Sequence, residues 1–377
     1  MRITHIITGL GQGGAESTLF RLCKACPEDI HTVVSMREEG VFSERLRSFG
    51  IEVYHLNIDS GLDAVLALPK LTYFLARQAP DVIQTWMYHA NLFGGVAARL
   101  AGIRNVHWGL RHGVVDDAVT KNETLRVIHL SARLSKILPK SIVSCSTVGA
   151  DNHVEIGYAA DRMIIIPNGL ELGEFTPHLR RTPLSDICGA AINPDLPILG
   201  MVARYNPYKD YSNLIEALGI LLDKGLAFHC LLAGEGISEY NTELVSALDS
   251  RNILSRVSLL GRRDDVPIVM NALDLSVLSS RGEAFPNVIA EAMACGIPCV
   301  TTDVGDAAFI VGDTGWVVPS QSPQDLAKAL ERALLEREND PLSWNQRKLS
   351  CRERVQQEFS MERMVLAYRS LWSNGVN

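Results

Sequence analysis

The stretch SSRGEAFPNVIAEAMACGIPCVTTDVG, residues 279–305, decides which fold the sequence predicts. The apolar run LSVLSS at 275–280 leads into it and is typical of a buried strand. Pro286 suits the first turn of a helix, where its missing N–H costs nothing, and Gly296 suits the position just after the helix end. Pro298 opens the next apolar run, so the stretch predicts a strand, a helix and a second, parallel strand.

Two carboxylates in this stretch need an explanation. Glu283 lies at the end of the strand, and Glu291 lies within the helix among apolar neighbours, where a carboxylate needs polar partners. The helix N-terminus offers unpaired N–H groups that favour a phosphate. A nucleotide diphosphate-sugar would satisfy all three features, with its phosphates at the helix start, its ribose on Glu291 and its sugar hydroxyls near Glu283. The alternative is a solvent-facing Glu291 and a Glu283 that caps the helix.

Short apolar runs alternate with helix-length amphipathic segments along the whole chain. The runs are continuously hydrophobic, as parallel strands covered on both faces are, and their alternation with helices predicts doubly wound sheets. About thirteen strands are too many for one typical sheet, so we expect two similar sheets. The expected strands are ITHIIT, HTVVSM, EVYHL, DVIQTW, NVHWGLRH, SIVSCS and MIIIPN in the first half, and PILGMVAR, FHCLLAG, VSLLG, LSVLSS, PCVTT and WVVP in the second.

The stretch at 166–186 is rich in Pro, Gly and charge, and we interpret it as the linker between two domains. We therefore expect an N-terminal domain at 1–175 and a C-terminal domain at 176–357. Residues 358–377 contain an amphipathic helix, which we expect to pack back on the N-terminal domain.

Composition and charge exclude several classes of protein. The 377 residues are 47% hydrophobic and 21% charged, which argues against disorder, and the net charge of −7 gives no reason to expect a nucleic-acid partner. The eight cysteines lack the spacing of a metal site or a disulfide framework, so we expect them to be reduced and mostly buried. No signal peptide is evident, and no apolar stretch approaches the ~20 residues that span a bilayer, so we expect a cytoplasmic protein.

The N-terminal stretch ITGLGQGGAES at 7–17 has the spacing G-x-G-x-x-G, which also occurs in dinucleotide-binding turns. An NAD site needs an acidic residue at the end of the second strand, where it binds the ribose. Here Arg37 comes first after that strand, and acidic residues follow only later. An oxidoreductase would also leave the pair Glu283 and Glu291 unexplained, so a dinucleotide site is the weaker alternative.

Several segments of the chain resemble glycosyltransferase family 4, whose members are retaining enzymes of the GT-B fold. The most specific is GEAFPNVIAEAMACGIPCVTTDVGD, which resembles that family's E-x7-E motif. The others follow in the family's order over nearly the whole chain: ITGLGQGGAES, VIQTWMYHANLFG, VHWGLRHG, IIIPNGLELGEFTP, GMVARYNPYKDYSNLIEA, LLAGEG and VSLLGRRDDVP. The resemblance implies an α/β protein with two Rossmann-like, doubly wound parallel-sheet domains that face each other across a cleft.

The resemblance also implies a set of donor-binding residues. Arg204 and Lys209 would clamp the diphosphate, where fixed cations stabilise the charge of a departing phosphate. Glu283 would hold the sugar hydroxyls and Glu291 the ribose. Backbone groups of two short segments would contact the donor: Gly13 and Gly14 in the glycine turn, and Phe285, Pro286 and Asn287 at the helix start, although Pro286 has no N–H to donate.

Other residues are implied near the acceptor. His112 corresponds to the family histidine that approaches the transferred sugar or the acceptor, and it completes an expected catalytic set with Glu283, Arg204 and Lys209. The residues expected to bind the acceptor are Arg111, His89 and Asp116, and for both histidines a structural role is the alternative. No D-x-D triplet occurs in the sequence, so we expect neither a metal nor a cofactor.

The activity that the resemblance implies is transfer of a hexose or N-acetylhexosamine from a nucleotide-sugar, with UDP favoured over GDP. The acceptor would be a glycan or lipid-linked saccharide of a bacterial surface polysaccharide such as O-antigen, capsule or exopolysaccharide. The alternative is an inactive nucleotide-sugar-binding or scaffold protein. The basic segment at 120–141 carries Leu and Ile between its cations, which is typical of a helix on anionic lipid and also of a solvated helix. We expect it to contact the cytoplasmic face of the inner membrane.

Overall fold

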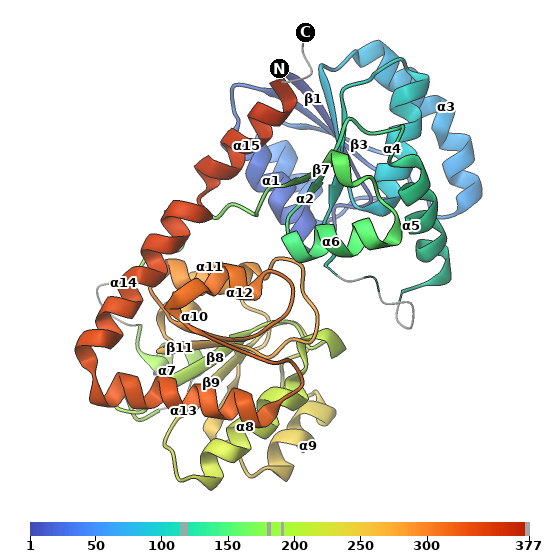
Figure 1. Cartoon of the computed structure of the whole chain (residues 1–377). Helices are drawn as coiled ribbons and strands as arrows, with labels where there is room; N and C mark the ends of the chain where they lie inside the picture. Colours follow the sequence, from blue (N-terminus) through green and yellow to red (C-terminus); the bar gives the residue numbers. More distant parts are fainter. Residues whose placement is uncertain (114, 116–119, 179–181, 190–191, 374–377) are drawn as a thin grey trace. The chain divides into compact units, whose positions relative to one another are not determined.

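Two parallel sheets organise the chain in the computed structural model, each within its own unit (Figure 1). The N-terminal unit contains Met1–Gly169 together with the chain from Met361 onward, and the C-terminal unit contains Leu170–Ser360. The sequence placed these boundaries after residues 175 and 357. The residues that the structure describes are 1–113, 115, 120–178, 182–189 and 192–373.

The sheet of the N-terminal unit has seven strands in the order β3-β2-β1-β4-β5-β6-β7. All its pairings are parallel, and β1 lies between β2 and β4, with Ile3 opposite His31 on one side and Val82 on the other. The strands are β1 (Arg2–Ile7), β2 (Ile30–Ser35), β3 (Glu52–His55), β4 (Val82–Trp86), β5 (Val106–Leu110), β6 (Ser141–Ser144) and β7 (Met163–Ile165).

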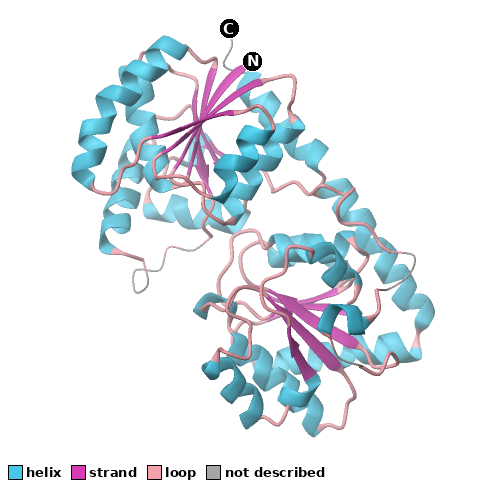
Figure 2. Cartoon of the chain, turned by 180° about the vertical axis from the view of Figure 1, so that it is seen from behind, coloured by secondary structure: helices cyan, strands magenta, loops and turns pink. Residues whose placement is uncertain are grey.

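Helices cover both faces of this sheet because its strands are apolar on both sides (Figure 2). Ile3 and Ile7 face a core made with α1, α2 and α15, whereas Ile6 faces a core made with α3, α4 and α5. The helices of this unit are α1 (Gly14–Ala25), α2 (Val41–Ser48), α3 (Gly61–Gln78), α4 (Tyr88–Leu100), α5 (Asn122–Leu134), α6 (Thr147–Ile156), the 3-10 turn η1 (Ala160–Arg162) and α15 (Met361–Ser373).

The last helix, α15, is a full member of the N-terminal unit. Its buried face contributes Met364, Tyr368 and Trp372 to the core on the side of α1 and α2. The indole N–H of Trp372 donates to the side-chain oxygen of Gln84 on β4 at 3.3 Å. The buried apolar face of α15 therefore packs the C-terminal segment of the chain against the sheet that contains β1.

The sheet of the C-terminal unit has six parallel strands in the order β10-β9-β8-β11-β12-β13. The strands are β8 (Ile198–Val202), β9 (His229–Ala233), β10 (Val257–Leu259), β11 (Leu275–Leu278), β12 (Cys299–Thr302) and β13 (Trp316–Val318). The helices are α7 (Leu184–Cys188), α8 (Tyr211–Asp223), α9 (Thr242–Ser250), α10 (Val266–Asn271), α11 (Asn287–Ala294), α12 (Ala307–Val311), α13 (Pro323–Asn339) and α14 (Pro341–Glu358), with 3-10 turns η2 (Pro207–Lys209), η3 (Leu254–Arg256) and η4 (Gly312–Thr314).

Each expected strand is present in the structure, divided between the two sheets as the sequence predicts. In both sheets the strand order reverses direction beside the first strand, between β1 and β4 and between β8 and β11. Open α/β sheets bind ligands outside the carboxyl ends of their strands at such a switch point. Functional residues are therefore expected at the carboxyl ends of β1 and β4 in one sheet and of β8 and β11 in the other.

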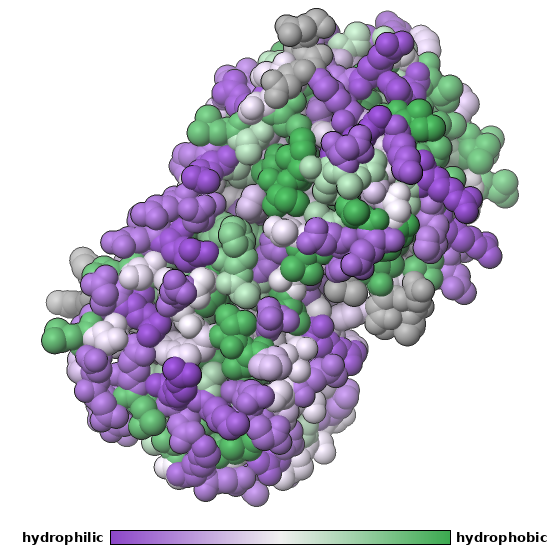
Figure 3. Space-filling model, in the orientation of Figure 1, coloured by the Kyte–Doolittle hydropathy of each residue, from purple (hydrophilic) through white to green (hydrophobic). Residues whose placement is uncertain are grey.

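Hydrophilic side chains cover most of the visible surface, but apolar ones gather over α3 (Figure 3). This helix is apolar on its buried side and also exposes Leu62, Val65, Leu66 and Tyr73. Among the described residues, no helix is both long and apolar enough to cross a membrane. None of the eight cysteines forms a disulfide, and all except Cys188 are buried.

Candidate active site

Two loops meet at the switch point of the C-terminal sheet. Strand β8 leads into the loop that carries Arg204 and the turn η2, which ends at Lys209. Strand β11, hydrogen-bonded next to β8, leads into the segment that carries Glu283 and then into α11. The sequence thus places a cationic loop and an acidic loop on adjacent parallel strands, and the topology brings them to one edge.

Lys209 and Glu283 form an ion pair at this edge. The ammonium Nζ lies 2.5 Å from the carboxylate Oε1, and the side chains are only 21% and 13% exposed. The hydroxyl of Ser280 donates to the same carboxylate oxygen at 2.7 Å. Two donors therefore hold Glu283 in one orientation in a half-buried setting, where a charge-assisted hydrogen bond is stronger than at an open surface.

The backbone around Lys209 is fastened from β11. The buried hydroxyl of Ser279 lies 2.9 Å from the carbonyl oxygen of Lys209 and 3.0 Å from that of Asp210. Asp210 takes a left-handed conformation, with φ of 47°, and its carboxylate accepts the backbone N–H of Asn213 as the N-cap of α8. Neighbouring serines thus position the two partners: Ser279 fixes the Lys209 loop and Ser280 fixes the Glu283 side chain.

A tight turn presses against the segment that precedes α11. Gly305 has a φ of +54°, and a Cβ at this position would lie 2.4 Å from the carbonyl oxygen of Ala284 and 2.6 Å from that of Glu283. Only glycine fits such a close approach with this backbone conformation. The backbone N–H of Asp306 donates to the Ala284 carbonyl at 2.9 Å, so the turn after β12 supports the Glu283 backbone.

The start of α11 differs slightly from the prediction. The helix begins at Asn287, and Pro286 is its extended N-cap residue rather than a residue of its first turn. Phe285 and Pro286 are buried, whereas Asn287 and Glu291 are half-buried. Gly296 follows the helix with a φ of +72°, as expected for the residue after the helix end.

Arg204 lies beside the same edge with an exposed side chain. The backbone before it is held at Ala203, whose N–H donates to Ala233 at 2.8 Å. The four charged residues expected from the sequence, Arg204, Lys209, Glu283 and Glu291, thus belong to one unit. Lys209 and Glu283 are in direct contact.

The glycine turn lies at the corresponding edge of the N-terminal sheet. Gly13 is the extended N-cap residue of α1 and Gly14 is its first residue. A Cβ on Gly13 would lie 2.6 Å from a carboxylate oxygen of Glu16, so that side chain folds back over the turn. Arg37, which follows the second strand, packs beside Gly9, at the place where an NAD site would have an acidic residue.

His112 follows β5 at this edge and stacks on Tyr88, with ring centroids 5.1 Å apart. Desolvation, and secondarily the nearby His153, lowers the pKa of His112. The hydroxyl of Tyr88 lies 2.8 Å from Nε2 of His153, whose Nδ1–H donates to Gly149. Tyr88 is therefore the donor, and the imidazole of His112 is neutral at neutral pH.

Arg111 is committed to partners within the N-terminal unit. Its Nη1 donates to the side-chain oxygen of Asn168 at 2.7 Å and its Nη2 to the hydroxyl of Tyr368 at 2.5 Å. The guanidinium also lies 4.6 Å from the ring centre of Trp86, within cation–π range. Asn168 lies at the end of the first chain segment of this unit, Met1–Gly169, and Tyr368 lies in its second segment, on α15. Arg111 therefore connects the two segments, a structural role that the sequence did not indicate.

The remaining acceptor candidates are less defined. His89 is half-buried in the first turn of α4, and desolvation together with the nearby Arg37 lowers its pKa. Met87, two residues before it, is the N-cap residue of α4 and has a positive φ of 72°. Asp116 lies outside the described residues.

A buried polar chain in the N-terminal unit was also missed. The indole N–H of Trp86 donates to Nδ1 of His5 at 3.2 Å, so the His5 proton is on Nε2 and donates to Nδ1 of His31 at 3.0 Å. The remaining N–H of His31 then donates to the carbonyl of Cys26 at 3.1 Å. Cys23 lies close to both imidazoles, whose ring nitrogens are engaged in these hydrogen bonds.

Comparison with known proteins identifies the fold and the class of protein. Two glycosyltransferase models match the chain, the model for Glycosyltransferase Family 4 over residues 12–174 and the model for Glycosyl transferases group 1 over residues 196–336. The structure resembles that of Anabaena Alr3699/HepE in complex with UDP, with a TM-score of 0.84 and 22% sequence identity over 99% of this chain and 100% of that chain. The fold is therefore the GT-B fold of glycosyltransferases.

Curated relatives match most of the chain. The UDP-Gal:alpha-D-GlcNAc-diphosphoundecaprenol alpha-1,3-galactosyltransferase of Escherichia coli is 24% identical over 87% of this chain and 84% of the relative. The N,N'-diacetylbacillosaminyl-diphospho-undecaprenol alpha-1,3-N-acetylgalactosaminyltransferase of Campylobacter jejuni is 23% identical over 92% of this chain and 93% of the relative. The chain belongs to the group 1 glycosyltransferases, with an N-terminal part of family 4.

Proposed function

We propose that this glycosyltransferase transfers a hexose or N-acetylhexosamine from a UDP-sugar, without a metal and with retention of the anomeric configuration. The name of the Escherichia coli relative contains UDP-Gal, and the similar Anabaena structure contains UDP. These two observations favour UDP over GDP as the nucleotide.

The ion pair of Lys209 with Glu283 is the observation that carries the proposal. It lies at the switch point of the C-terminal sheet, in the segment that leads into α11. In the proposed complex, Lys209 and Arg204 contact the diphosphate near the N-terminus of α11, and Glu283 accepts hydrogen bonds from the sugar hydroxyls. Glu291 holds the ribose.

The proposed chemistry is a displacement on one face of the sugar. The acceptor hydroxyl oxygen forms a bond to the anomeric carbon as the bond from that carbon to the β-phosphate oxygen breaks. The departing phosphate takes the hydroxyl proton. Negative charge grows on the diphosphate during this step, and the cations of Lys209 and Arg204 stabilise it. Glu291 is assigned to the ribose and Glu283 to the sugar hydroxyls, so neither of these carboxylates acts as the nucleophile that a retaining glycosidase uses.

The acceptor that we propose is a glycan or lipid-linked saccharide of a bacterial surface polysaccharide. Both relatives carry diphosphoundecaprenol-linked sugars in their names. His112 would lie near the transferred sugar, and His89 with Asp116 would contact the acceptor. Membrane contact through residues 120–141 belongs to the same proposal, since such an acceptor is anchored in lipid.

Nucleotide release from a panel of sugar donors tests the proposal. We expect release of UDP from one or more UDP-hexoses or UDP-N-acetylhexosamines, no release of GDP from GDP-sugars, and the same rate after treatment with EDTA. Loss of the activity in EDTA with recovery on adding Mg²⁺ or Mn²⁺ would contradict the metal-free mechanism. Turnover of GDP-sugars alone would contradict the choice of nucleotide.

A further inference from the structure

Helix α3 has two apolar faces, of which one is buried and the other is exposed. Ala67, Leu71 and Leu75 lie in the core that this helix shares with α4 and the sheet. The opposite face carries four large apolar residues that are 64–77% exposed: Leu62, Val65, Leu66 and Tyr73. A helix that is apolar on both faces is typical of one with neighbours on both sides.

The exposed apolar residues of α3 form a continuous row. They follow one another at the helical steps of three and four residues that place side chains on one side of a helix. Such a row is the surface through which two helices pack against each other. We call it the α3 stripe, and its exposed members are Leu62, Val65, Leu66, Pro69, Tyr73 and Ala76.

The charges along α3 differ between its two ends. Asp59 and Asp63 lie at the N-terminal end, whereas Lys70 and Arg77 lie in the second half of the helix. An antiparallel partner helix of the same sequence would place its basic end beside the acidic end of α3, and a parallel one would bring like charges together. The pattern is therefore complementary to itself in the antiparallel direction.

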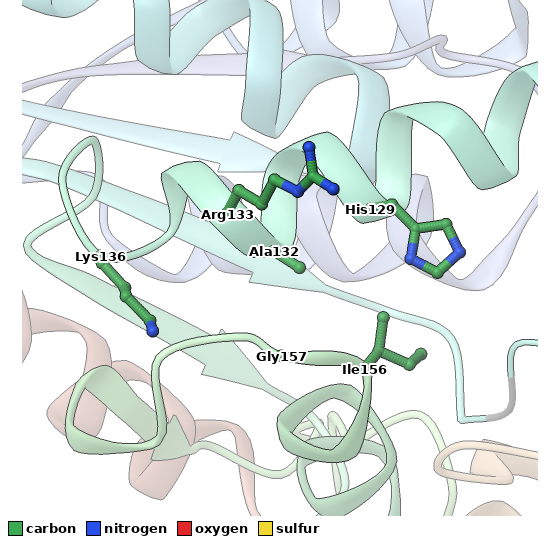
Figure 4. Close-up of a pocket in the computed structure, with 6 residues that line it drawn as sticks. All are labelled: His129, Ala132, Arg133, Lys136, Ile156 and Gly157. Atoms are coloured by element: carbon green, nitrogen blue, oxygen red, sulfur yellow. The ribbon is translucent and has the colours of Figure 1, made fainter.

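An anionic membrane is a weaker fit to the α3 stripe. Helices that bind such a surface carry an excess of cations on their polar face, whereas residues 59–77 contain two acidic and two basic residues. The N-terminal unit has a basic surface elsewhere: Figure 4 shows Arg133 and Lys136 at a hollow where α5 ends. That hollow belongs to the segment 120–141, to which the lipid contact is already assigned.

The area of the stripe is sufficient for a pair of copies. The exposed parts of its four large residues come to roughly 500 Å² per copy, so a symmetric pair would bury roughly 1,000 Å², which is the lower limit of a specific interface. Interfaces of this size are mostly reversible, so we expect a dissociation constant in the micromolar range.

We propose that two copies of this chain associate through the α3 stripe, with the two helices antiparallel around a two-fold axis near Pro69. Each copy then covers the stripe of the other, and the same residues serve on both sides of the contact, as a two-fold interface requires. Pro69 lies in the middle of the stripe, seven residues from Leu62 and seven from Ala76.

Sedimentation velocity of the full chain from about 1 to 100 µM tests the association. The sedimentation coefficient should rise with concentration from that of a monomer to that of a dimer. Leu66→Glu places a carboxylate inside the contact in both copies and should weaken association at least about tenfold. Because Leu66 is exposed in the single chain, this variant should keep the wild-type fold and the wild-type release of UDP.

Leu349→Glu is the matched control, because Leu349 is also an exposed leucine on a helix, α14, with 59% exposure. It should associate like the wild type, and an equal loss in both variants would overturn the role of the stripe. A wild-type chain that stays monomeric at the highest concentration would overturn the proposal. If such a monomer floated with lipid vesicles and Leu66→Glu did not, the stripe would belong to a membrane instead.

Cross-linking tests the antiparallel direction. Pro69→Cys places two thiols near the two-fold axis, where a short bismaleimide should join the two copies. Leu62→Cys should not cross-link, because its two thiols would lie about 20 Å apart at a rise of 1.5 Å per residue. The wild-type chain provides the background, since all of its cysteines except Cys188 are buried. Cross-linking of both variants would indicate a parallel pair and contradict the proposed geometry.

Discussion

Lys209 and Glu283 neutralise each other's charge and hold each other's side chain in position through their ion pair. Lys209→Met removes the cation that we assign to the diphosphate and leaves Glu283 half-buried without it. We expect the rate of UDP release to fall by about 10²–10³-fold, the usual effect of losing one group that stabilises transition-state charge. Steady-state kinetics of the purified variant provide the measurement.

The matched control for this change is Lys224→Met. Lys224 also pairs with a glutamate, Glu331, at 2.5 Å in the same unit, but its side chain is 43% exposed and lies away from the β8 and β11 edge. The rate should stay within about twofold of wild type, because an exposed pair contributes little. Equal losses in both variants would show that the Lys209 effect is one of general stability.

Gly305 offers a test of how the turn after β12 supports Glu283. Gly305→Ala adds a methyl group where two carbonyl oxygens lie within 2.6 Å, at a φ of +54°. We expect it to lower the free energy of unfolding by roughly 2–4 kcal/mol, because strain of the backbone and overpacking add. Gly225→Ala is the control, since its φ is +76° but nothing lies within 4 Å, and it should cost only about 1 kcal/mol. Similar losses in urea denaturation would refute the close-contact argument.

At the scale of elements, Arg111 connects β5, the end of the first chain segment and α15. Arg111→Ala should loosen α15, and Tyr368→Phe removes only the hydroxyl that accepts from this guanidinium. A double-mutant cycle on the free energy of unfolding should give a coupling of about 1–3 kcal/mol for this charged hydrogen bond. Strict additivity of the two changes would mean that the contact does not hold the helix.

The histidine chain across β1, β2 and β4 makes the N-terminal unit sensitive to acid. Burial lowers the pKa values of His5 and His31, and it also lowers the pKa of His107, a buried residue of the neighbouring strand β5, to about 4. Because the unfolded chain takes up protons near pH 6.5 and the folded chain does not, stability is retained above this pH and falls as the pH drops below it. Calorimetry from pH 7.5 to 5 should show the decline.

His5→Gln should flatten this pH dependence, since the substituted side chain does not titrate. Replacing the exposed His178 by Gln serves as the control and should leave the slope as it is in wild type. A slope unchanged by His5→Gln would place the acid sensitivity elsewhere in the chain.

The sequence predicted elements well and side-chain partnerships poorly. Continuous apolar runs identified every strand of both sheets, because strands buried on both faces need such runs. The hydrogen bonds of Ser279 and Ser280 depend on how β8 and β11 pair, and local sequence does not contain that information. The contact of Arg111 with Tyr368 joins residues 257 positions apart, so no pattern of spacing could predict it.

At the scale of the whole molecule, the chain has two Rossmann-like units, and its end returns to the first of them. The sequence placed the expected donor residues within the C-terminal unit, where the structure also has Arg204, Lys209, Glu283 and Glu291. The expected acceptor residues that the structure describes, Arg111 and His89, belong to the N-terminal unit. The expected donor residues and the expected acceptor residues thus lie in different units, as we expect of an enzyme whose two substrates are bound by different domains.

A crystal structure of the chain with UDP is the most direct test of the account. We predict a diphosphate oxygen within hydrogen-bonding distance of Nζ of Lys209, with the ribose hydroxyls on the carboxylate of Glu291 and the phosphates at the start of α11. A nucleotide bound anywhere else in either unit, with the Lys209 and Glu283 pair untouched, would contradict the claim that this edge of the C-terminal sheet binds the donor.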